Sequence, residues 1–230
     1  NSIKLVFSDS SQLGDDQPLY NGCVNFFLNA TQNFYAFLAN SPLFAKLVNG
    51  YLSEIESKTQ KQICVFSSII ETCYKNDSAI IDSIEKDQEN FAIKTILENC
   101  DKEPFIYIAA LFLEKENIIN SKIEILNPIF EEKGLATYCL NLVLVNNPAL
   151  VSIENAPSLA EALFNYTKKH KEERLFCQKA FETIKILRTN TGSDALEEII
   201  RKNHDSVDPS FPGVLELYPD LALSRINDLF

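Results

Sequence analysis

Apolar residues recur at intervals of three and four positions along most of the chain, which is the spacing of one face of an α-helix. The clearest case starts at Ser41 and Pro42, a cap residue followed by proline at the first helical position. Two apolar rows then form one stripe, made of Leu43, Leu47, Tyr51 and Ile55 with Phe44, Val48 and Leu52 beside them. This pattern predicts an amphipathic helix with one buried face.

The same spacing predicts about a dozen helices along the chain. They are expected over 20–38, 63–73, 79–84, 91–97, 105–113, 123–130, 135–146, 159–166, 175–187 and 195–200, with a last one from Pro219. Strict alternation of apolar and polar residues is rare, and only six glycines are available for hairpin turns. We therefore expect an all-α fold of short antiparallel helices.

The loops contain residues that typically end and begin helices. In RTNTGSDALEE, Gly192 is expected to end one helix, and Asp194 with Glu197 to form a capping box that opens the next. Prolines begin several apolar runs, in the segments SPLF, NPIF, NPAL and APSL. Their spacing is irregular, so the sequence gives no fixed repeat period.

The stretch 135–150, LATYCLNLVLVNNPAL, is apolar nearly all round. On a helical wheel one side is lined by Leu135, Tyr138, Cys139, Leu142 and Val145. A helix this apolar must be covered on more than one side, as the inner helix of a stacked array is.

This stretch resembles the armadillo repeat, whose inner helix carries an A-x-[aromatic]-x-L-x-N-L pattern before a short N-P turn. The matching residues are Ala136, Tyr138, Leu140, Asn141 and Leu142, followed by Asn147 and Pro148, with one residue missing between Leu140 and Asn141. The following stretch, 158–187, resembles the second and third helices of another repeat. The resemblance covers 123–187 and implies a right-handed α-solenoid, an armadillo/HEAT-like superhelix.

In armadillo proteins the inner helices line a groove that binds extended peptides or partner domains. By position, the resemblance therefore implies that Asn141 faces such a groove and contacts a partner. The alternative for Asn141 is a side chain that satisfies a neighbouring backbone group. We predict a single helical-repeat domain over 19–230, preceded by an acidic polar segment over 1–18.

The chain carries a net charge of −11. A surface this acidic repels the phosphates of nucleic acids and anionic lipids, so neither is expected as a partner. The sequence has no apolar run long enough to cross a membrane, so no membrane insertion is expected. The expected partner is another protein, bound through a basic or amphipathic segment; the oligomeric state is left open.

The six cysteines contain no C-x-x-C pair, and most lie among apolar residues at helical spacing. This is typical of reduced, buried thiols in a cytoplasmic or nuclear protein.

No catalytic residue, cofactor or metal site is predicted. His170 and Cys177 are two helical turns apart, about 10.5 Å on an unbroken helix, too far for a thiolate–imidazolium pair. Neither clustered cysteines nor an H-x-x-x-H spacing indicates zinc, and an EF-hand loop from Asp9 would place Tyr20 where an acid is required. The basic run 168–171 is a weak candidate for phosphate, because Glu172 and Glu173 follow it directly.

These patterns favour a non-enzymatic interaction module that acts as a scaffold or adaptor. An alternative of the same class is a regulator of a small GTPase or of a chaperone ATPase, which would clasp the nucleotide-binding domain. The alternative of a different class is an all-α enzyme that uses Cys177 or Cys64, which requires an accessible thiol of low pKa.

Overall fold

A computed structural model describes residues 17–221, which form α-helices and short 3-10 helices with no β-strand in that range. The prediction of an all-α fold is confirmed there. The helices fall into two compact units that divide between Lys115 and Glu116, and each is described by itself as unit 1 (17–115) or unit 2 (116–221). The single domain over 19–230 stays a prediction, and most of the acidic segment 1–18 lies outside the described residues.

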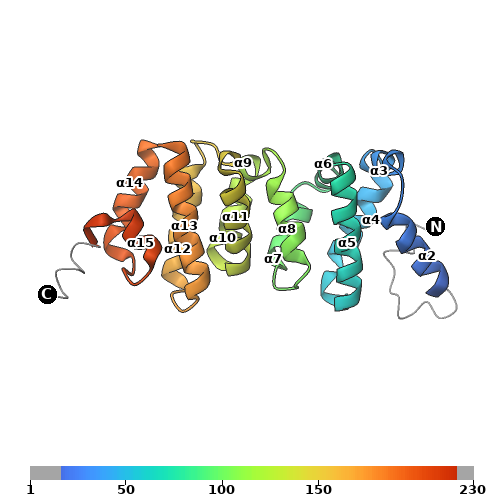
Figure 1. Cartoon of the computed structure of the whole chain (residues 1–230), viewed down its shortest axis with the longest axis horizontal. Helices are drawn as coiled ribbons and strands as arrows, with labels where there is room; N and C mark the ends of the chain where they lie inside the picture. The colour runs from blue at the N-terminus through green and yellow to red at the C-terminus, as the bar shows by residue number, and fades with distance from the viewer. Residues whose placement is uncertain (1–16, 222–230) are drawn as a thin grey trace. The chain divides into compact units, whose positions relative to one another are not determined.

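Unit 1 consists of seven α-helices and one short 3-10 helix among its described residues (Figure 1). They are α2 (Gln17–Leu28), α3 (Gln32–Ala39), α4 (Pro42–Ser53), η3 (Ile55–Ser57), α5 (Gln60–Asn76), α6 (Ala79–Asp87), α7 (Phe91–Glu98) and α8 (Phe105–Glu114). Helix contacts recur at every third α-helix: α2 packs on α5 and α5 on α8, while α3 packs on α6 and α4 on α7. The repeating element of unit 1 is therefore a set of three helices.

Unit 2 pairs longer helices with very short ones (Figure 1). Its elements are α9 (Ile118–Ser121), α10 (Ile123–Glu132), α11 (Gly134–Asn146), η4 (Pro148–Leu150), α12 (Ala156–Lys169), α13 (Arg174–Thr191), α14 (Asp194–Asn203), η5 (His204–Ser206) and α15 (Pro212–Leu217). From α10 on, contacts recur at every second α-helix: α10 packs on α12 and α12 on α14, while α11 packs on α13 and α13 on α15. The one-turn elements α9 and η4 precede the pairs α10–α11 and α12–α13.

Each unit has its own core of aromatic and aliphatic side chains. In unit 1, Tyr51 of α4 stacks on Phe66 of α5 with ring centroids 4.3 Å apart, and Phe105 of α8 lies 6.1 Å beyond Phe66. In unit 2, Phe181 of α13 contacts the rings of Phe164 and Phe211. Burial of such rings supplies most of the favourable free energy of folding, at about 25 cal/mol per Å² of apolar surface.

The prediction of one helix over 20–38 is wrong. Helix α2 ends at Leu28, and α3 begins after Thr31, whose backbone is extended at φ −78° and ψ 159°. Across this break the hydroxyl of Tyr35 donates a hydrogen bond to the carbonyl of Phe27 at 2.6 Å. The apolar spacing continues through the break, and no proline or glycine marks it.

The predicted helix ends are confirmed at Ser41 and Gly192. Ser41 is the cap of α4, with Pro42 at the first turn, and Gly192 ends α13 in the left-handed region at φ 55°. The capping box at Asp194 and Glu197 is wrong. Ser193 caps α14 instead, its hydroxyl accepting a hydrogen bond from the backbone N–H of Leu196.

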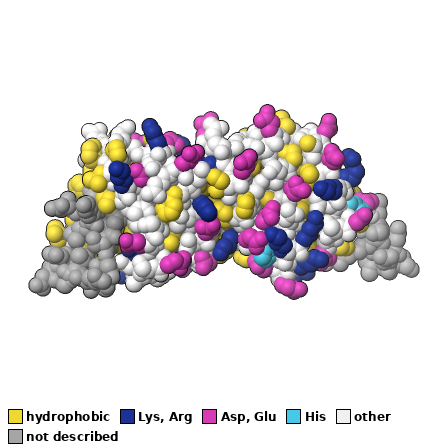
Figure 2. Space-filling model, turned by 180° about the vertical axis from the view of Figure 1, so that it is seen from behind, with side chains coloured by type: hydrophobic (Ala, Val, Ile, Leu, Met, Phe, Trp, Pro, Cys, Tyr) yellow, Lys and Arg dark blue, Asp and Glu magenta, His cyan; other side chains and the backbone are white. Residues whose placement is uncertain are grey.

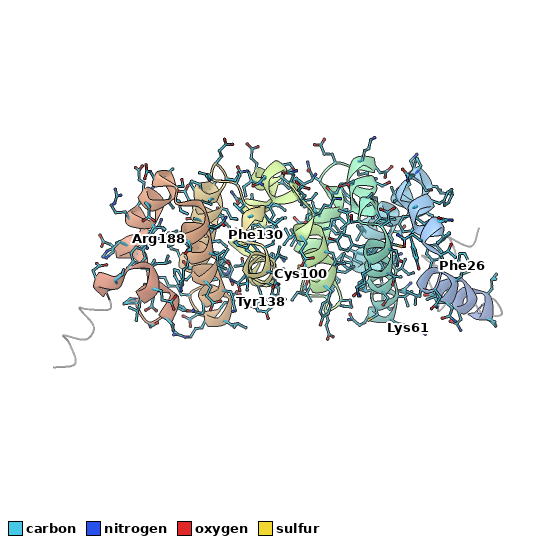
Figure 3. All side chains as sticks on the ribbon, turned by 45° about the horizontal axis from the view of Figure 1, so that its top comes forward. Phe26, Lys61, Cys100, Phe130, Tyr138 and Arg188 are labelled. Atoms are coloured by element: carbon cyan, nitrogen blue, oxygen red, sulfur yellow. The ribbon has the colours of Figure 1, made fainter. Side chains whose placement is uncertain are left out.

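The carboxylate of Glu197 is instead bound by Arg188 of α13, labelled in Figure 3, through two hydrogen bonds of 2.6 and 2.8 Å. A third guanidinium N–H of Arg188 donates to the backbone carbonyl of Leu217 in α15. Arg188 therefore joins α13, α14 and α15. The sequence did not predict α9 or α15. Pro128 lies inside α10, as the prediction of a helix over 123–130 implies. The helix expected from Pro219 lies mostly outside the described residues.

Candidate functional site

The side of helix α11 that is buried differs from the predicted one. The buried residues of α11 are Gly134, Ala136, Thr137, Cys139, Leu140, Asn141, Val143 and Leu144. Of the predicted side, Leu142 is 41% exposed and Val145 is 60% exposed, and Tyr138, labelled in Figure 3, is half-buried. The helix is covered on more than one side, as expected, yet part of the predicted core face lies at the surface.

Asn141 lies in the interior of unit 2 with 1% of its surface exposed. Its side-chain amide donates a hydrogen bond of 3.1 Å to the hydroxyl of Thr183 on α13, and that hydroxyl donates to the carbonyl of Lys179. In this conformation Asn141 presents no open surface to a partner, so its predicted contact with one stays a prediction. The alternative was a bond to a neighbouring backbone group, whereas the observed acceptor is the side chain of Thr183 on α13.

A groove with a volume of about 580 Å³ runs beside α11. Its lining is formed by Leu144, Val145, Pro148, Gln178, Glu182, Lys185, Ile186, Thr189, Asn190 and Glu216, from α11, η4, α13 and α15. This volume lies within the range of about 300–1,000 Å³ that is common for ligand sites. The exposed Leu142 lies one helical turn from Val145, so the apolar surface extends beyond the groove.

The rim of the groove is polar and its charges are paired. Lys179 binds Glu182 with 2.6 Å between nitrogen and oxygen, and Lys185 forms an ion pair with Glu216. The side-chain amide of Asn190 donates to the carbonyl of Pro148 and so joins α13 to η4. An apolar strip between paired charges suits an amphipathic segment better than a small charged ligand.

Five of the six cysteines are buried and Cys64 is exposed, and all six thiols are free. The thiol of Cys177 donates a hydrogen bond of 3.1 Å to the backbone carbonyl of His170, because the chain reverses between α12 and α13. Burial raises the pKa of the Cys177 thiol to about 11 and that of Cys73 to about 12. Since the thiolate is the nucleophile, Cys177 is poorly suited to covalent catalysis at neutral pH.

Within the basic run 168–171, Lys169 and His170 lie close to acidic side chains of α10. Lys169 lies 2.5 Å from Glu132 and 3.5 Å from Glu131, and these carboxylates, Glu132 first, raise the pKa of Lys169. The imidazole of His170 stacks on the ring of Tyr166 with centroids 4.7 Å apart. The expectation that Glu172 and Glu173 neutralise this run is corrected for Lys169, whose partners are on α10.

His204 lies at the surface between two carboxylates. Its Nδ1 is 2.8 Å from Asp205, and its Nε2 is 2.6 Å from Asp220. Hydrogen bonds to these carboxylates, Asp205 first, raise the pKa of His204 above its ordinary value of 6.5. This arrangement stabilises the charged imidazolium.

Over residues 17–221 no group of three or more His, Cys, Asp or Glu side chains is placed to hold a metal ion. Within the same range, no helix has the length and apolarity that crossing a membrane requires. On the face that Figure 2 shows, acidic side chains are scattered among lysines and arginines. Comparisons with protein-family models, with curated proteins and with solved structures find no match for this chain.

Sequence reasoning missed two parts of the groove. Val145 was placed in the core, because its apolar neighbours on α11 gave no sign of which side is open. Glu216 lies on α15, which was not predicted as a helix, so the far edge of the groove had no signal in the sequence.

Proposed function

We propose that this chain is a non-enzymatic protein–protein interaction module of the armadillo/HEAT type, a right-handed superhelix of stacked helices that acts as a scaffold or adaptor. The observation that carries the proposal is the groove of unit 2, with Leu142 and Val145 exposed along α11. Apolar side chains lost from water on binding contribute to affinity, and a polar rim sets the orientation of the partner. The free cysteines support a cytoplasmic or nuclear setting.

The expected partner presents an amphipathic helix that lays its apolar face in the groove. Its polar face is expected to be basic, because the chain as a whole carries a net charge of −11. Long-range attraction of this kind raises the association rate, and it is screened beyond about 8 Å at physiological ionic strength. The association rate should therefore fall as salt is raised.

The proposal is tested by selecting peptides from a phage-displayed random library on the full chain. Selected peptides are expected to be basic, with apolar residues at helical spacing. They should bind Val145→Ser about tenfold more weakly, since a buried valine contributes about 1.5 kcal/mol. Ile153→Ser is the matched control, because Ile153 is also 60% exposed in unit 2 but does not line the groove.

Peptides that bind both variants as tightly as the unmodified chain would contradict the assignment to this groove. Selection of acidic or purely polar peptides would contradict the proposed partner chemistry. Both substituted residues are exposed, so the thermal stability of the variants should stay close to that of the unmodified chain. A change in affinity can then be assigned to the groove itself.

A further inference from the structure

The helices at the beginning of unit 1 carry no charge. Residues 17–45, which contain α2, α3 and the first turn of α4, include no Asp, Glu, Lys, Arg or His, although 23% of the residues of the chain are charged. Helix α11 also lacks charged residues, but it is buried on several sides. In α3, by contrast, only Tyr35, Leu38 and Ala39 are buried. The absence of charge in α2 and α3 therefore belongs to a surface and not to a core.

Four large apolar side chains are exposed in this part of the chain. They are Leu19 and Phe26 of α2, Phe37 of α3 and Leu43 of α4, each more than half exposed. Phe26, labelled in Figure 3, contacts Phe34 of α3 with ring centroids 4.9 Å apart, and Phe37 lies one turn beyond Phe34. Only residues 40–41 separate α3 from α4. The four exposed side chains thus come from three neighbouring helices, and together we name them the uncharged surface.

The stacking of unit 1 leaves these helices open on one side. Helices α5, α6 and α7 stack on α2, α3 and α4, respectively. No described helix precedes α2, α3 and α4 to stack on their other side (Figure 1). The end repeat of a helical stack needs a polar outer face if it is to face water. Exposed phenylalanine and leucine at this end therefore indicate that a further layer covers it.

We propose that the uncharged surface joins two copies of this chain end to end in a symmetric dimer. Two chains that each carry a net charge of −11 repel one another, and residues 17–45 are the longest stretch where contact brings no like charges together. The exposed side-chain amides of Asn25 and Asn33 each offer donors and an acceptor. They are therefore complementary to the same residues of a second copy, whereas a charged partner meets no opposite charge here.

The exposed apolar area matches the requirement of a dimer. Each of the four side chains exposes about 100 Å², which gives about 400 Å² of apolar surface per copy. A stable interface buries about 800 Å² per partner, of which a little over half is apolar. The uncharged surface supplies most of that apolar area, and the amides of Asn25 and Asn33 contribute to the polar remainder.

The proposal is tested by analytical ultracentrifugation of the full chain over a range of concentrations. A reversible equilibrium between monomer and dimer is expected. A chain that stays monomeric at about 200 µM would overturn the proposal, since interfaces of this size bind at micromolar concentration or below. Association that continues beyond the dimer would overturn the symmetric contact, which closes after two copies.

Two variants and a control test the residues. Phe37→Asp should raise the dissociation constant of the dimer about a hundredfold or more, because a symmetric interface loses the same ring twice. Leu43→Ser should raise it about tenfold for the same reason. Tyr107→Asp is the control, because Tyr107 is also exposed in unit 1 but lies on α8, and it should dimerise like the unmodified chain.

The three substituted side chains are exposed, so the melting temperatures of the monomeric variants should stay close to one another. Unchanged dimerisation in both Phe37→Asp and Leu43→Ser would contradict the assignment to the uncharged surface. An equal loss in Tyr107→Asp would contradict it as well.

Salt and mixed pairs test the chemistry and the symmetry of the contact. The dimer should not weaken as salt is raised, because salt screens the repulsion between two acidic chains and the contact itself holds no ion pair. Weakening at high salt would therefore overturn an uncharged interface. A mixed pair of Phe37→Asp with the unmodified chain should bind about tenfold more weakly than the unmodified pair. Undiminished affinity would show that two different surfaces meet.

The groove of unit 2 and the uncharged surface can fail independently. Val145→Ser should leave the dimer intact, and Phe37→Asp should bind the peptides selected on the groove as the unmodified chain does. Loss of the dimer in Val145→Ser would place the contact in unit 2 and overturn the proposal.

Discussion

Units 1 and 2 differ in the helix that begins each repeat. In unit 1 this is a full helix: α3 has 8 residues and α6 has 9, and the two pack on one another. In unit 2 the same place is taken by α9 with 4 residues and η4 with 3. The following helices, α10 with α12 and α11 with α13, pack on each other in the same order as α4 with α7 and α5 with α8.

The short elements of unit 2 are joined by hydrogen bonds in addition to packed side chains, since Ile118 and Ile119 of α9 are buried. Asn120, at the end of α9, donates to the carbonyl of Leu150 at 3.0 Å and accepts from the backbone N–H of Ser152 at 2.8 Å. The side chain of Asn155 donates to the backbone carbonyl of Asn120 at 3.1 Å. In unit 1, α3 and α6 likewise contribute buried side chains, such as Leu38 and Ile80. The short first elements of unit 2 therefore combine a few buried apolar side chains with hydrogen bonds from Asn120.

Of the substitutions that test how the short elements of unit 2 are held, Asn120→Ala is expected to change stability the most. The substitution leaves the carbonyl of Leu150 and the N–H of Ser152 without their partner, which should lower the free energy of unfolding by about 2–3 kcal/mol. Chemical denaturation followed by circular dichroism measures the change. Asn146→Ala is the control, because the side chain of Asn146 bonds only to its own helix and is exposed.

A loss in Asn120→Ala no larger than in Asn146→Ala would contradict a main role for the Asn120 hydrogen bonds in joining the short elements. The short elements would then be held mainly by their neighbours α10 and α12.

The units also differ in the space around a helical glycine, Gly134 in unit 2 and Gly50 in unit 1. At Gly134, a Cβ atom would lie 2.5 Å from the hydroxyl oxygen of Tyr166 and would also overlap the ring of Phe176, whereas a Cβ atom at Gly50 meets nothing within 4 Å. Gly134→Ala should therefore lower the free energy of unfolding by about 1–3 kcal/mol through overpacking. Gly50→Ala should raise it by about 0.5–1 kcal/mol, because alanine favours the helix. Thermal melts of the two variants give the opposite signs directly.

A rise in the free energy of unfolding in Gly134→Ala would show that the ring of Phe176 and the hydroxyl of Tyr166 move aside at little cost. Gly22→Ala provides a second test in unit 1, since a Cβ there also meets no atom within 4 Å.

Much of the helical architecture was readable from sequence because a buried helix face imposes a spacing of three and four. The spacing fails where a helix ends without proline or glycine, as between Leu28 and Gln32. It also fails for the one-turn helix α9, which is too short to show a period. The hydrogen bonds of Asn120 cross 30 residues of sequence or more, so no local pattern announces them.

The candidate site was less predictable than the fold. An apolar helix such as α11 shows that several sides are covered, but only the packing of α13 decides that Asn141 is buried and Val145 exposed. Polar residues brought together by packing leave no spacing signal in a single sequence.

Each unit also has a buried asparagine that bonds to a side chain of another helix, and the energetic coupling of each pair can be measured. Asn141 donates to the hydroxyl of Thr183 in unit 2, and Asn49 donates to the carboxylate of Asp87 at 3.0 Å in unit 1. A double-mutant cycle with Asn141→Ala and Thr183→Val should give a coupling of about 1 kcal/mol. The cycle with Asn49→Ala and Asp87→Ala should give more, because its acceptor is charged.

Measuring both the stability and the peptide affinity of Asn141→Ala also tests whether Asn141 contacts a partner. A stable Asn141→Ala variant that loses affinity for the selected peptides would support the predicted partner contact. A destabilised variant that keeps its affinity per folded molecule would assign Asn141 to the core.

The smallest expected effect is a dependence of stability on pH. Histidine can contribute it only in unit 2, since both histidines of the chain lie there. Asp205 and Asp220 raise the pKa of His204 in the folded chain. The folded state therefore binds the proton of His204 more tightly than the unfolded state does. The stabilisation is therefore complete below pH 6.5, the ordinary value, and is lost as the pH rises through the higher folded pKa. The melting temperature of the unmodified chain relative to His204→Ala should accordingly decrease between pH 6 and 8. A difference that stays constant, or grows with pH, would show that the carboxylates do not hold the imidazolium in the folded chain.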